Sequence, residues 1–205
     1  MKIAVLASGR GSNLESLLQA ETENRLGGAE IGLVFSDQPL ALALERGRAH
    51  GKKTACLSPK DFDSKQAYEK ALVLLLNKEK IDLVVLAGYM RITGEGLLSA
   101  YGGRMINIHP SLLPSFPGLD AQAQAVSHGV KISGCTVHLV DAGMDTGPII
   151  AQRAVPVYAE DTEAELSARI LLEEHKLLPQ VVSWIARGKV LLAKEAVRFV
   201  DEKSL

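Results

Sequence analysis

The sequence contains few cysteines, few aromatic residues and no excess of either charge. There are 2 cysteines in 205 residues, 4% aromatic residues with a single tryptophan, and 23 basic against 24 acidic residues. Cys56 and Cys135 have no C-x-x-C partner, so we expect no cysteine metal site and predict two buried free thiols in a reducing compartment. The balanced charge argues against nucleic acid as a partner.

Long hydrophobic runs and several common motifs are also absent. No stretch approaches the ~18 consecutive apolar residues of a membrane span, and the apolar run Ile3–Ala7 is too short for the hydrophobic region of a signal peptide. We therefore expect a cytoplasmic protein with no membrane partner. The sequence also lacks the Walker A motif, the G-x-S-x-G elbow and the H-E-x-x-H or H-x-x-x-H spacing, so no metal site is predicted.

Short apolar runs alternate with amphipathic runs, which predicts an α/β fold. The expected strands are Ile3–Ala7, Ile31–Phe35, Lys53–Leu57, Leu83–Ala87, Met105–His109, Ser133–Val140 and Ile149–Val155. The expected helices are Asn13–Ala20, Leu40–His50, Lys65–Lys80, Gly94–Tyr101 and Thr162–Arg187. The early alternation indicates right-handed βαβ units, hence an open twisted sheet with a parallel, Rossmann-like N-terminal half.

The second half of the sequence follows a different pattern. Only a glycine-rich loop separates Ser133–Val140 from Ile149–Val155, so these two strands should pair antiparallel. We expect Pro179 to kink or break the long C-terminal helix, and Ala196–Val200 to add an edge strand.

A glycine-rich turn follows the first strand. Gly11, Ser12 and Asn13 stand where a helix begins, and free N–H groups at a helix N-terminus bind phosphate. Ser12 or Asn13 could also cap the helix. Leu14 replaces the third glycine of the dinucleotide fingerprint and Asp37 is a weak candidate for a ribose contact, so a phosphate monoester fits better than a dinucleotide. A plain capped turn remains the alternative.

The strand Met105–His109 carries the most informative polar pair. Asn107 and His109 are two residues apart and therefore project from the same face, while Ile106 and Ile108 point into a core. Pro110 ends the strand. A glycine-flanked aspartate, Asp145, could return to orient the imidazole, and this trio suits acyl-type transfer.

Two further segments could line this site. Residues 86–92 mix apolar side chains with free backbone groups and could form a slot for a flat heterocycle, although an ordinary strand end explains them as well. The loop Ser111–Asp120 is either a wall or lid of the site or a rigid connector. His138 lies in a predicted strand, and its role is left open.

Four landmarks occur in order: Gly-Arg-Gly-Ser-Asn, Leu-Ala-Gly-Tyr-Met-Arg, Asn-Ile-His-Pro-Ser-Leu-Leu-Pro and Asp-Ala-Gly-Met-Asp-Thr-Gly-Pro-Ile. With them the whole chain resembles the 10-formyltetrahydrofolate-dependent formyltransferases, and within these the phosphoribosylglycinamide formyltransferase family of purine biosynthesis. The resemblance implies transfer of a formyl group from 10-formyltetrahydrofolate, as co-substrate, to the amine of 5-phosphoribosylglycinamide.

The resemblance also implies residue roles. Asn107 and His109 would stabilise an oxyanion, and Asp145 would keep His109 protonated, with its pKa above about 6.5. The ribonucleotide would contact Gly11, Ser12, Asn13, Leu171, Leu172, Glu173 and Glu174. The folate would contact Lys65, Tyr89, Met90, Arg91, Ile92, Thr93, Asn107, Asp141, Ala142, Gly143, Met144 and Asp145. Lys65, Thr93 and Asp120 depart from the pattern that is common in the family.

We expect a single formyltransferase domain, 1–205, composed of a phosphate-binding βαβ half (1–103) and a catalytic and folate-binding half (104–205). A tRNA-directed relative would have a further C-terminal domain, and a deformylase an N-terminal regulatory domain. The rival hypothesis is a non-catalytic sensor of a phosphate ligand, which would explain the glycine loop but not Asn107, His109 and Asp145 together. The partners are small molecules, and a homodimer is left open.

Overall fold

The computed structural model describes residues 1–194 and 196–200. Its strands are β1 (Lys2–Leu6), β2 (Glu30–Ser36), β3 (Thr54–Cys56), β4 (Leu83–Leu86), β5 (Met105–His109), β6 (Ile132–Leu139), β7 (Ile149–Pro156), β8 (Val190–Ala193) and β9 (Ala196–Phe199). Its helices are α1 (Ser12–Thr22), α2 (Leu42–Ala49), α3 (Lys65–Lys78), α4 (Glu95–Tyr101), α5 (Ala121–Ser127) and α6 (Glu163–Ala186), with a short 3₁₀ turn at Pro59–Asp61.

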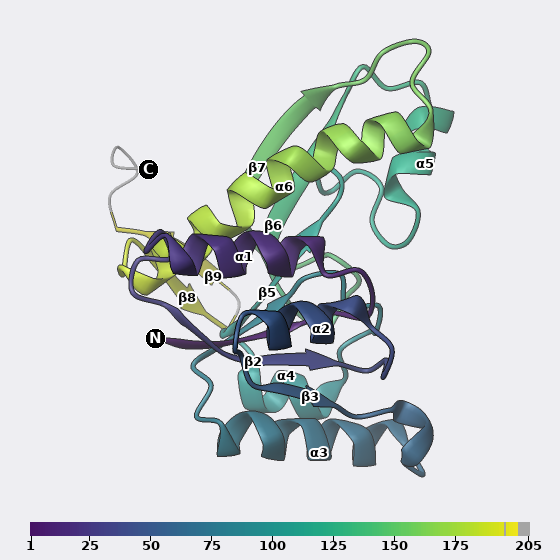
Figure 1. Cartoon of the computed structure of the whole chain (residues 1–205). Coiled ribbons are helices and arrows are strands. Elements are labelled where there is room, and N and C mark those ends of the chain that lie inside the picture. The colour runs from purple at the N-terminus through teal and green to yellow at the C-terminus, as the bar shows by residue number, and fades with distance from the viewer. Residues whose placement is uncertain (195, 201–205) are drawn as a thin grey trace.

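Seven strands form one sheet in the order β3-β2-β1-β4-β5-β6-β7 (Figure 1). Strands β1 to β5 pair in parallel, and β6 and β7 are antiparallel. The chain moves from β1 to β2 on one side and later returns to β4 on the other. The carboxyl ends of β1 and β4 therefore flank a topological switch point, where open α/β sheets bind ligands.

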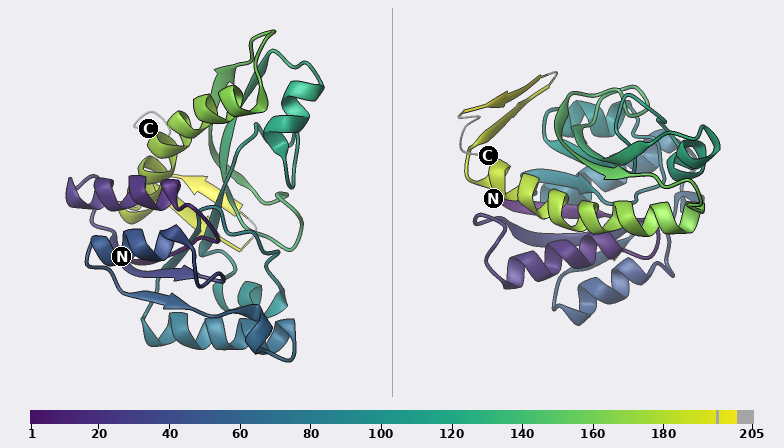
Figure 2. Two further views of the ribbon diagram at one scale, coloured as in Figure 1. Left: turned by 45° about the vertical axis from the view of Figure 1, so that its right-hand side comes forward. Right: turned by 90° about the horizontal axis from the view of Figure 1, so that it is seen from above.

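Helices cover both faces of this sheet (Figure 2). Helices α1, α2 and α6 pack on one face, where Leu17 and Leu18 of α1 join a core with Ile106 and Ile108. Helices α3 and α4 pack on the other face, where Leu72 joins a second core. Strands buried on both faces account for the nearly continuous apolar runs in β1 and β4, because no side of either strand meets water.

The predicted mixed sheet, with a parallel N-terminal half, antiparallel C-terminal strands and a long C-terminal helix, is confirmed. Three expectations need correction. Ala196–Phe199 is a strand, but it pairs with β8 in a separate two-stranded sheet rather than at an edge of the main sheet. Helix α6 continues through Pro179, so of the two alternatives for this proline, a kink or a break, the break is wrong. Cys56 is a free thiol but only half-buried, whereas Cys135 is fully buried.

Helix α5 was not predicted. It is short and lies in the stretch 110–131 between β5 and β6, where glutamines and alanines give only a weak apolar pattern. Among the residues that the structure describes, no helix combines the length and apolar character needed to cross a membrane.

Candidate active site

The turn after β1 is shaped by one glycine. Gly11 precedes helix α1 with φ 69° and ψ 33°, a left-handed conformation that L-residues with a Cβ rarely adopt. A Cβ at this position would also lie 2.8 Å from Ala43 Cα. No side chain caps the helix, so the idea that Ser12 or Asn13 is the N-cap is wrong. The first turn of α1 therefore has N–H groups that no side-chain cap engages among the described residues.

Asn13 turns inward from this turn and contacts the C-terminal helix. Its Nδ2 donates to Glu174 Oε2 at 2.7 Å, and its buried Oδ1 has no hydrogen-bond partner among the residues that the structure describes. Both residues are buried, with 8% and 6% of their surfaces exposed. Burial raises the pKa of Glu174, and the hydrogen bond from Asn13 opposes this rise. Two predicted ribonucleotide residues, 161 positions apart, thus meet in one pair.

Helix α6 does not present all of its predicted residues in the direction of Glu174. Leu171 lies three residues before Glu174 and therefore on the same side of the helix. Leu172 is 62% exposed, and Glu173 forms a surface ion pair with Lys176 at 2.7 Å. Glu174 contacts the glycine loop through Asn13, and the contact of the whole group with the ribonucleotide stays a prediction.

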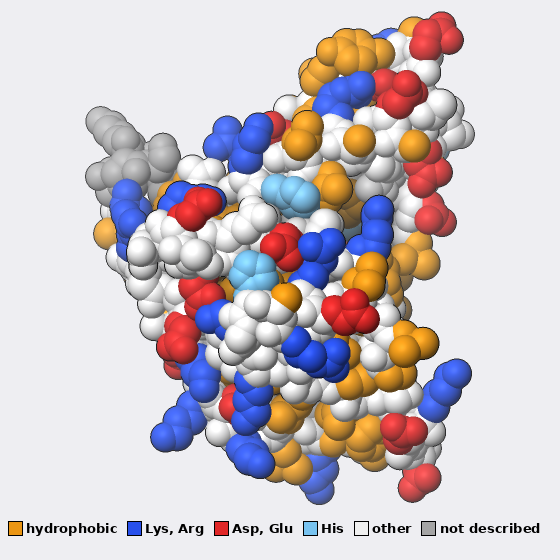
Figure 3. All heavy atoms as spheres, viewed as in Figure 1, with side chains coloured by type: hydrophobic (Ala, Val, Ile, Leu, Met, Phe, Trp, Pro, Cys, Tyr) orange, Lys and Arg blue, Asp and Glu red, His pale blue; other side chains and the backbone are white. Residues whose placement is uncertain are grey.

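A hollow of about 290 Å³ lies beside the start of α1. Its lining includes Ser12, Arg25, Arg46 and His175. Arg46 is already paired with Glu15 at 2.9 Å. On the face formed by α1, α2 and α6, acidic and basic side chains are interspersed (Figure 3). The arginines make the potential beside Ser12 more favourable for an anion, although Glu15 offsets part of that charge.

Asn107 and His109 project from the same face of β5, as predicted, and Ile106 and Ile108 enter the core on the opposite face. Strand β6 runs antiparallel beside them and places His138 directly opposite Asn107. Directly opposite residues share a face of the sheet. The side-chain amide of Asn107 lies 3.1 Å from His138 Nε2 and 3.5 Å from Asp145 Oδ1.

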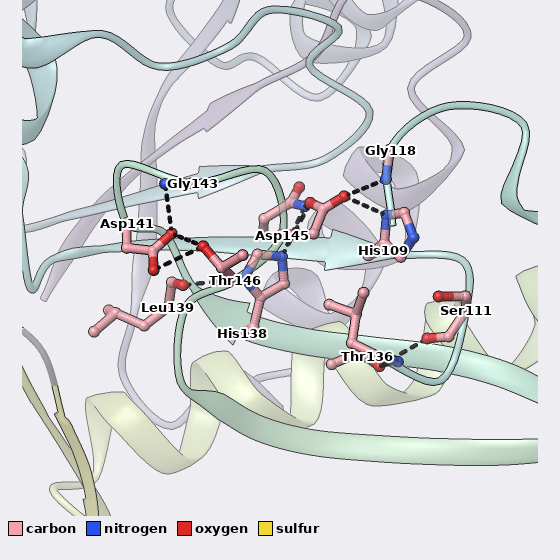
Figure 4. A network of polar contacts seen from close by, with 12 residues as sticks. His109, Ser111, Gly118, Thr136, His138, Leu139, Asp141, Gly143, Asp145 and Thr146 are labelled. Atoms are coloured by element: carbon pink, nitrogen blue, oxygen red, sulfur yellow. Dashed lines mark hydrogen bonds and ion pairs between the residues drawn. The ribbon is translucent and has the colours of Figure 1, made fainter. Parts of the chain in front are cut away.

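Asp145 returns to this face from the loop between β6 and β7 (Figure 4). Its Oδ2 lies 3.3 Å from His109 Nδ1 and accepts from the backbone N–H of Gly118 at 2.8 Å. Its Oδ1 lies 3.5 Å from His138 Nε2. Burial alone would raise the pKa of Asp145, but the contacts with His138, Gly118 and His109 outweigh it and lower that pKa. The carboxylate is therefore ionised in the neutral range.

His109 faces an acceptor at each ring nitrogen. Nε2 lies 2.8 Å from the carbonyl oxygen of Phe116, so Nε2 carries a hydrogen, and Nδ1 faces Asp145. Two acceptors favour the imidazolium. Burial nevertheless dominates and lowers the pKa of His109, while Phe116 and Asp145 act in the opposite direction. The prediction that Asp145 lifts this pKa above its free value is therefore wrong.

The segment after β4 is held at several points. The backbone N–H of Met90 donates to Ser8 Oγ at 2.9 Å, and the hydroxyl groups of Tyr89 and Tyr68 lie 2.7 Å apart. The Arg91 guanidinium lies 5.2 Å from the centre of the Tyr68 ring. The side chains of Met90 and Ile92 are 69% and 63% exposed. This segment therefore presents two large apolar side chains to the surface next to β5.

Lys65 begins helix α3 near the end of that segment. Its Nζ lies 3.9 Å from Glu69 Oε1, and the Glu69 carboxylate accepts from the backbone N–H groups of Gly94 and Gly96. Within the loop 141–145, Asp141 Oδ1 accepts from the N–H of Gly143 at 3.1 Å and from Thr146 Oγ1 at 2.8 Å. Met144, by contrast, is 54% exposed.

The comparisons with known proteins agree with one another. Residues 1–182 match the family model described as formyl transferase. The chain is 47% identical over 181 residues to phosphoribosylglycinamide formyltransferase of Bacillus subtilis (strain 168), covering 88% of this chain and 92% of that one. It is 42% identical to the protein of that name from Escherichia coli (strain K12), with 96% and 92% covered.

The chain belongs to the formyl transferase family. A solved structure of glycinamide ribonucleotide transformylase 1 from Symbiobacterium toebii superposes with a TM-score of 0.94 at 45% identity, covering 98% of this chain and 94% of that one. The fold predicted from the sequence and the fold of this family are therefore the same.

In this formyl transferase, sequence reasoning did not assign two supports of the site. His138, whose role the sequence left open, stands beside Asn107 and Asp145. Alternation along β6 indicates the face on which His138 lies, but only the register of β6 against β5 brings it opposite Asn107. Thr136, on the same strand, is fully buried, donates to the carbonyl oxygen of Ser111 at 2.7 Å and accepts from the N–H of Leu113 at 3.1 Å. It anchors the start of the loop that brings Phe116 to His109.

Among the described residues, no group of three or more His, Cys, Asp and Glu side chains is arranged to hold a metal ion. Asn107 and His109 offer an amide donor and an imidazole that both contact one carboxylate, that of Asp145. These groups can stabilise a developing negative oxygen and move a proton.

Proposed function

We propose that this chain transfers the formyl group of 10-formyltetrahydrofolate to the glycinamide amine of 5-phosphoribosylglycinamide, a step of purine biosynthesis. The observation that supports this most strongly is the convergence of Asn107, His109 and Asp145 beside the segment 89–93. A binding protein without catalysis has no use for a polarising amide, an imidazole and its carboxylate at one point. The identity of 42–47% to named phosphoribosylglycinamide formyltransferases supports the choice of substrates.

In the proposed reaction the glycinamide nitrogen attacks the formyl carbon. The electron pair of the carbonyl bond moves to oxygen and forms a tetrahedral oxyanion. Asn107 Nδ2 and an N–H of His109 donate to that oxygen. The oxyanion then collapses, the bond to N10 of the folate breaks, and the proton lost by the amine reaches N10, through water or through His109.

The lowered pKa of His109 changes one part of this scheme. The resting imidazole is neutral, so it can accept the amine proton as negative charge develops beside it. That charge, together with Asp145, favours the imidazolium only once the oxyanion exists. The Nε2 hydrogen of His109 is donated to the Phe116 carbonyl, so the loop 111–120 must give up this hydrogen bond if Nε2 is the donor to the oxyanion.

The proposed substrate contacts follow the geometry. The ribonucleotide phosphate binds the N–H groups at Gly11, Ser12 and Asn13, and Glu174 binds the part of the ligand nearest Asn13. The folate lies along segment 89–93, with Lys65 and the loop 141–145 at its margins. Met90, Ile92 and Met144 supply apolar surface to a flat ring.

Turnover tests the proposal. Enzyme, 5-phosphoribosylglycinamide and 10-formyltetrahydrofolate are mixed, and the change in the ultraviolet spectrum of the folate is followed. His109→Ala should lower kcat by roughly 10²–10³ while folate still binds, by analogy with other oxyanion donors. Absence of formyl transfer by the unaltered protein, with both substrates bound, would overturn the proposal.

A double mutant tests whether Asn107 and His109 share one oxyanion. Residues that act as a unit have non-additive effects, so Asn107→Ala combined with His109→Ala should lose less kcat than the product of the single losses. Multiplicative losses would mean that the two side chains act at separate steps.

A further inference from the structure

Asp37 is a buried carboxylate that the proposed reaction does not use. It follows β2, its surface is only 2% exposed, and it accepts from Ser8 Oγ at 2.6 Å and from Gln38 Nε2 at 3.1 Å. A buried carboxylate is costly unless hydrogen bonds satisfy it. Because only 2% of its surface is exposed, Asp37 does not present its carboxylate to a ribose, which is the role that its position after β2 suggested.

Ser8 connects this carboxylate to the segment after β4. A serine hydroxyl has one hydrogen to donate and two lone pairs to accept. The hydrogen goes to Asp37, so the lone pairs are left for the backbone N–H of Met90, which donates at 2.9 Å. The backbone N–H of Ser8 in turn donates to the carbonyl oxygen of Gly88 at 2.9 Å. Asp37 thereby sets the direction in which the Ser8 hydroxyl accepts.

The topology makes this contact informative. Strands β2, β1 and β4 are neighbours in that order, so Asp37, Ser8 and Met90 follow three adjacent carboxyl ends at the switch point. The chain leaves β4 through Gly88 with φ 76°, a turn that frees it from the sheet. Past that turn, segment 89–93 pairs with no strand among the described residues. The Ser8 hydroxyl accepts from the Met90 N–H in place of the carbonyl oxygen that a neighbouring strand would offer.

We infer that Asp37 and Ser8 are positioning residues for the folate, acting through the backbone N–H of Met90. The inference rests on the proposed function, since it assigns segment 89–93 to the folate. The hydrogen bond from the Met90 N–H to Ser8 Oγ fixes the orientation of segment 89–93. In that orientation the other backbone groups of the segment face the folate. Ser8 also precedes the phosphate loop directly, yet its side chain points to the folate side.

The test compares the two substrates in one set of variants. Ser8→Ala removes the acceptor of Met90 and should raise the KM for 10-formyltetrahydrofolate by roughly tenfold, the usual scale for one lost hydrogen bond to a positioned group. The KM for the ribonucleotide should stay within about twofold. Ser8→Thr keeps the hydroxyl and should restore the folate KM, and Asp37→Asn, which keeps an acceptor but loses the charge, should lie between.

Ser133→Ala is the matched control. Ser133 lies on β6 and is 2% exposed, and within the described part of the chain its buried hydroxyl has no hydrogen-bond partner, so its loss should leave both KM values unchanged. Two outcomes would overturn the inference: an equal change of both KM values in Ser8→Ala, or a folate KM that does not change.

Two further measurements test the inference without turnover and without relying on Ser8→Ala alone. Hydrogen exchange at the Met90 amide, followed by NMR, should accelerate in Asp37→Asn even if Ser8→Ala does not fold, and unchanged exchange would overturn the inference. Calorimetric titration with tetrahydrofolate, the proposed product, should show the same weakening as the folate KM. If the unaltered protein binds tetrahydrofolate but transfers no formyl group, the proposed function fails while the positioning role is still measured.

Discussion

At the scale of single residues, the catalytic trio shows how burial competes with charge. Asp145 lies 3.3 Å from His109 and favours the protonated imidazole, but burial of the ring disfavours this charged form by more than the carboxylate favours it. Asp145 also has φ 56°, a left-handed conformation that Asn and Asp tolerate better than most residues. The left-handed backbone at position 145 therefore favours Asp or Asn, and of these two only Asp supplies a charge to His109.

Asp145→Asn should keep the fold and lower kcat sharply, because Asn suits the same backbone conformation but carries no charge. The negative charge of Asp145 raises the pKa of His109, so without that charge the imidazole should titrate at a still lower pH. NMR of the ring protons measures this. A titration that stays where it was would refute the coupling, whatever happens to the activity.

Glu174→Gln should change how stability depends on pH. Burial raises the pKa of Glu174 in the folded state, so its contribution to stability is fully present below its unfolded value near 4.5 and is lost as pH rises through the folded value. The glutamine does not ionise, and its amide can donate to the orphaned Asn13 Oδ1. Relative to the unaltered protein, the variant should gain stability in urea titrations as pH rises from about 4 to 8.

The same variant tests the proposed ribonucleotide contact. If the Glu174 carboxylate binds the ligand, Glu174→Gln should raise the KM for the ribonucleotide and leave that for the folate unchanged. Equal loss of both affinities would place Glu174 in a purely structural role.

At the scale of elements, the site is assembled from strand ends and the turns that follow them. The glycine loop follows β1, segment 89–93 follows β4, and His109 ends β5, so three neighbouring strands contribute one group each. Period-2 alternation in β5 was enough to predict that Asn107 and His109 share a face. It could not predict His138, because the register of β6 against β5 depends on pairing across the sheet.

Gly11→Ala should destabilise the fold by about 2 kcal/mol or more, since the left-handed backbone alone costs about 1–2 kcal/mol and the new Cβ meets Ala43. The KM for the ribonucleotide should rise as well. Two controls separate the causes: Gly9→Ala has open space around it, and Gly129→Ala has φ 62° but no neighbour within 4 Å. A Gly11→Ala variant no less stable than Gly129→Ala would refute the close approach of Ala43.

At the scale of the whole molecule, the proposal of a single domain is supported by the main sheet, whose strands come from both halves of the chain. Strands β4 and β5 pair in parallel across the boundary at residue 103, and the N–H of Val84 donates to the carbonyl of Arg104. Asn13 and Glu174 join the two halves a second time. Neither half has a core that is complete without the other, because Ile106 and Leu17 belong to the same cluster.

Unfolding in urea should therefore be one transition. Fluorescence of Trp184, the single tryptophan, reports on α6, and far-UV circular dichroism reports on all helices and strands. Coincident curves indicate two-state behaviour. Tetrahydrofolate at about 100 times its Kd should shift both curves together by about 2.7 kcal/mol. Two separate midpoints would contradict the single-domain proposal.

The amino-acid sequence by itself determined the alternation of strands and helices, the glycine turn after β1, and the shared face of Asn107 and His109. Each follows from neighbours a few residues apart, through helix and strand periodicity and through the backbone freedom of glycine. The tertiary structure alone decided the burial that lowers the pKa of His109, the pairing of Asn13 with Glu174, and the two hydrogen bonds that connect Met90 through Ser8 to Asp37. These depend on contacts between distant segments, whose desolvation and register no local pattern contains.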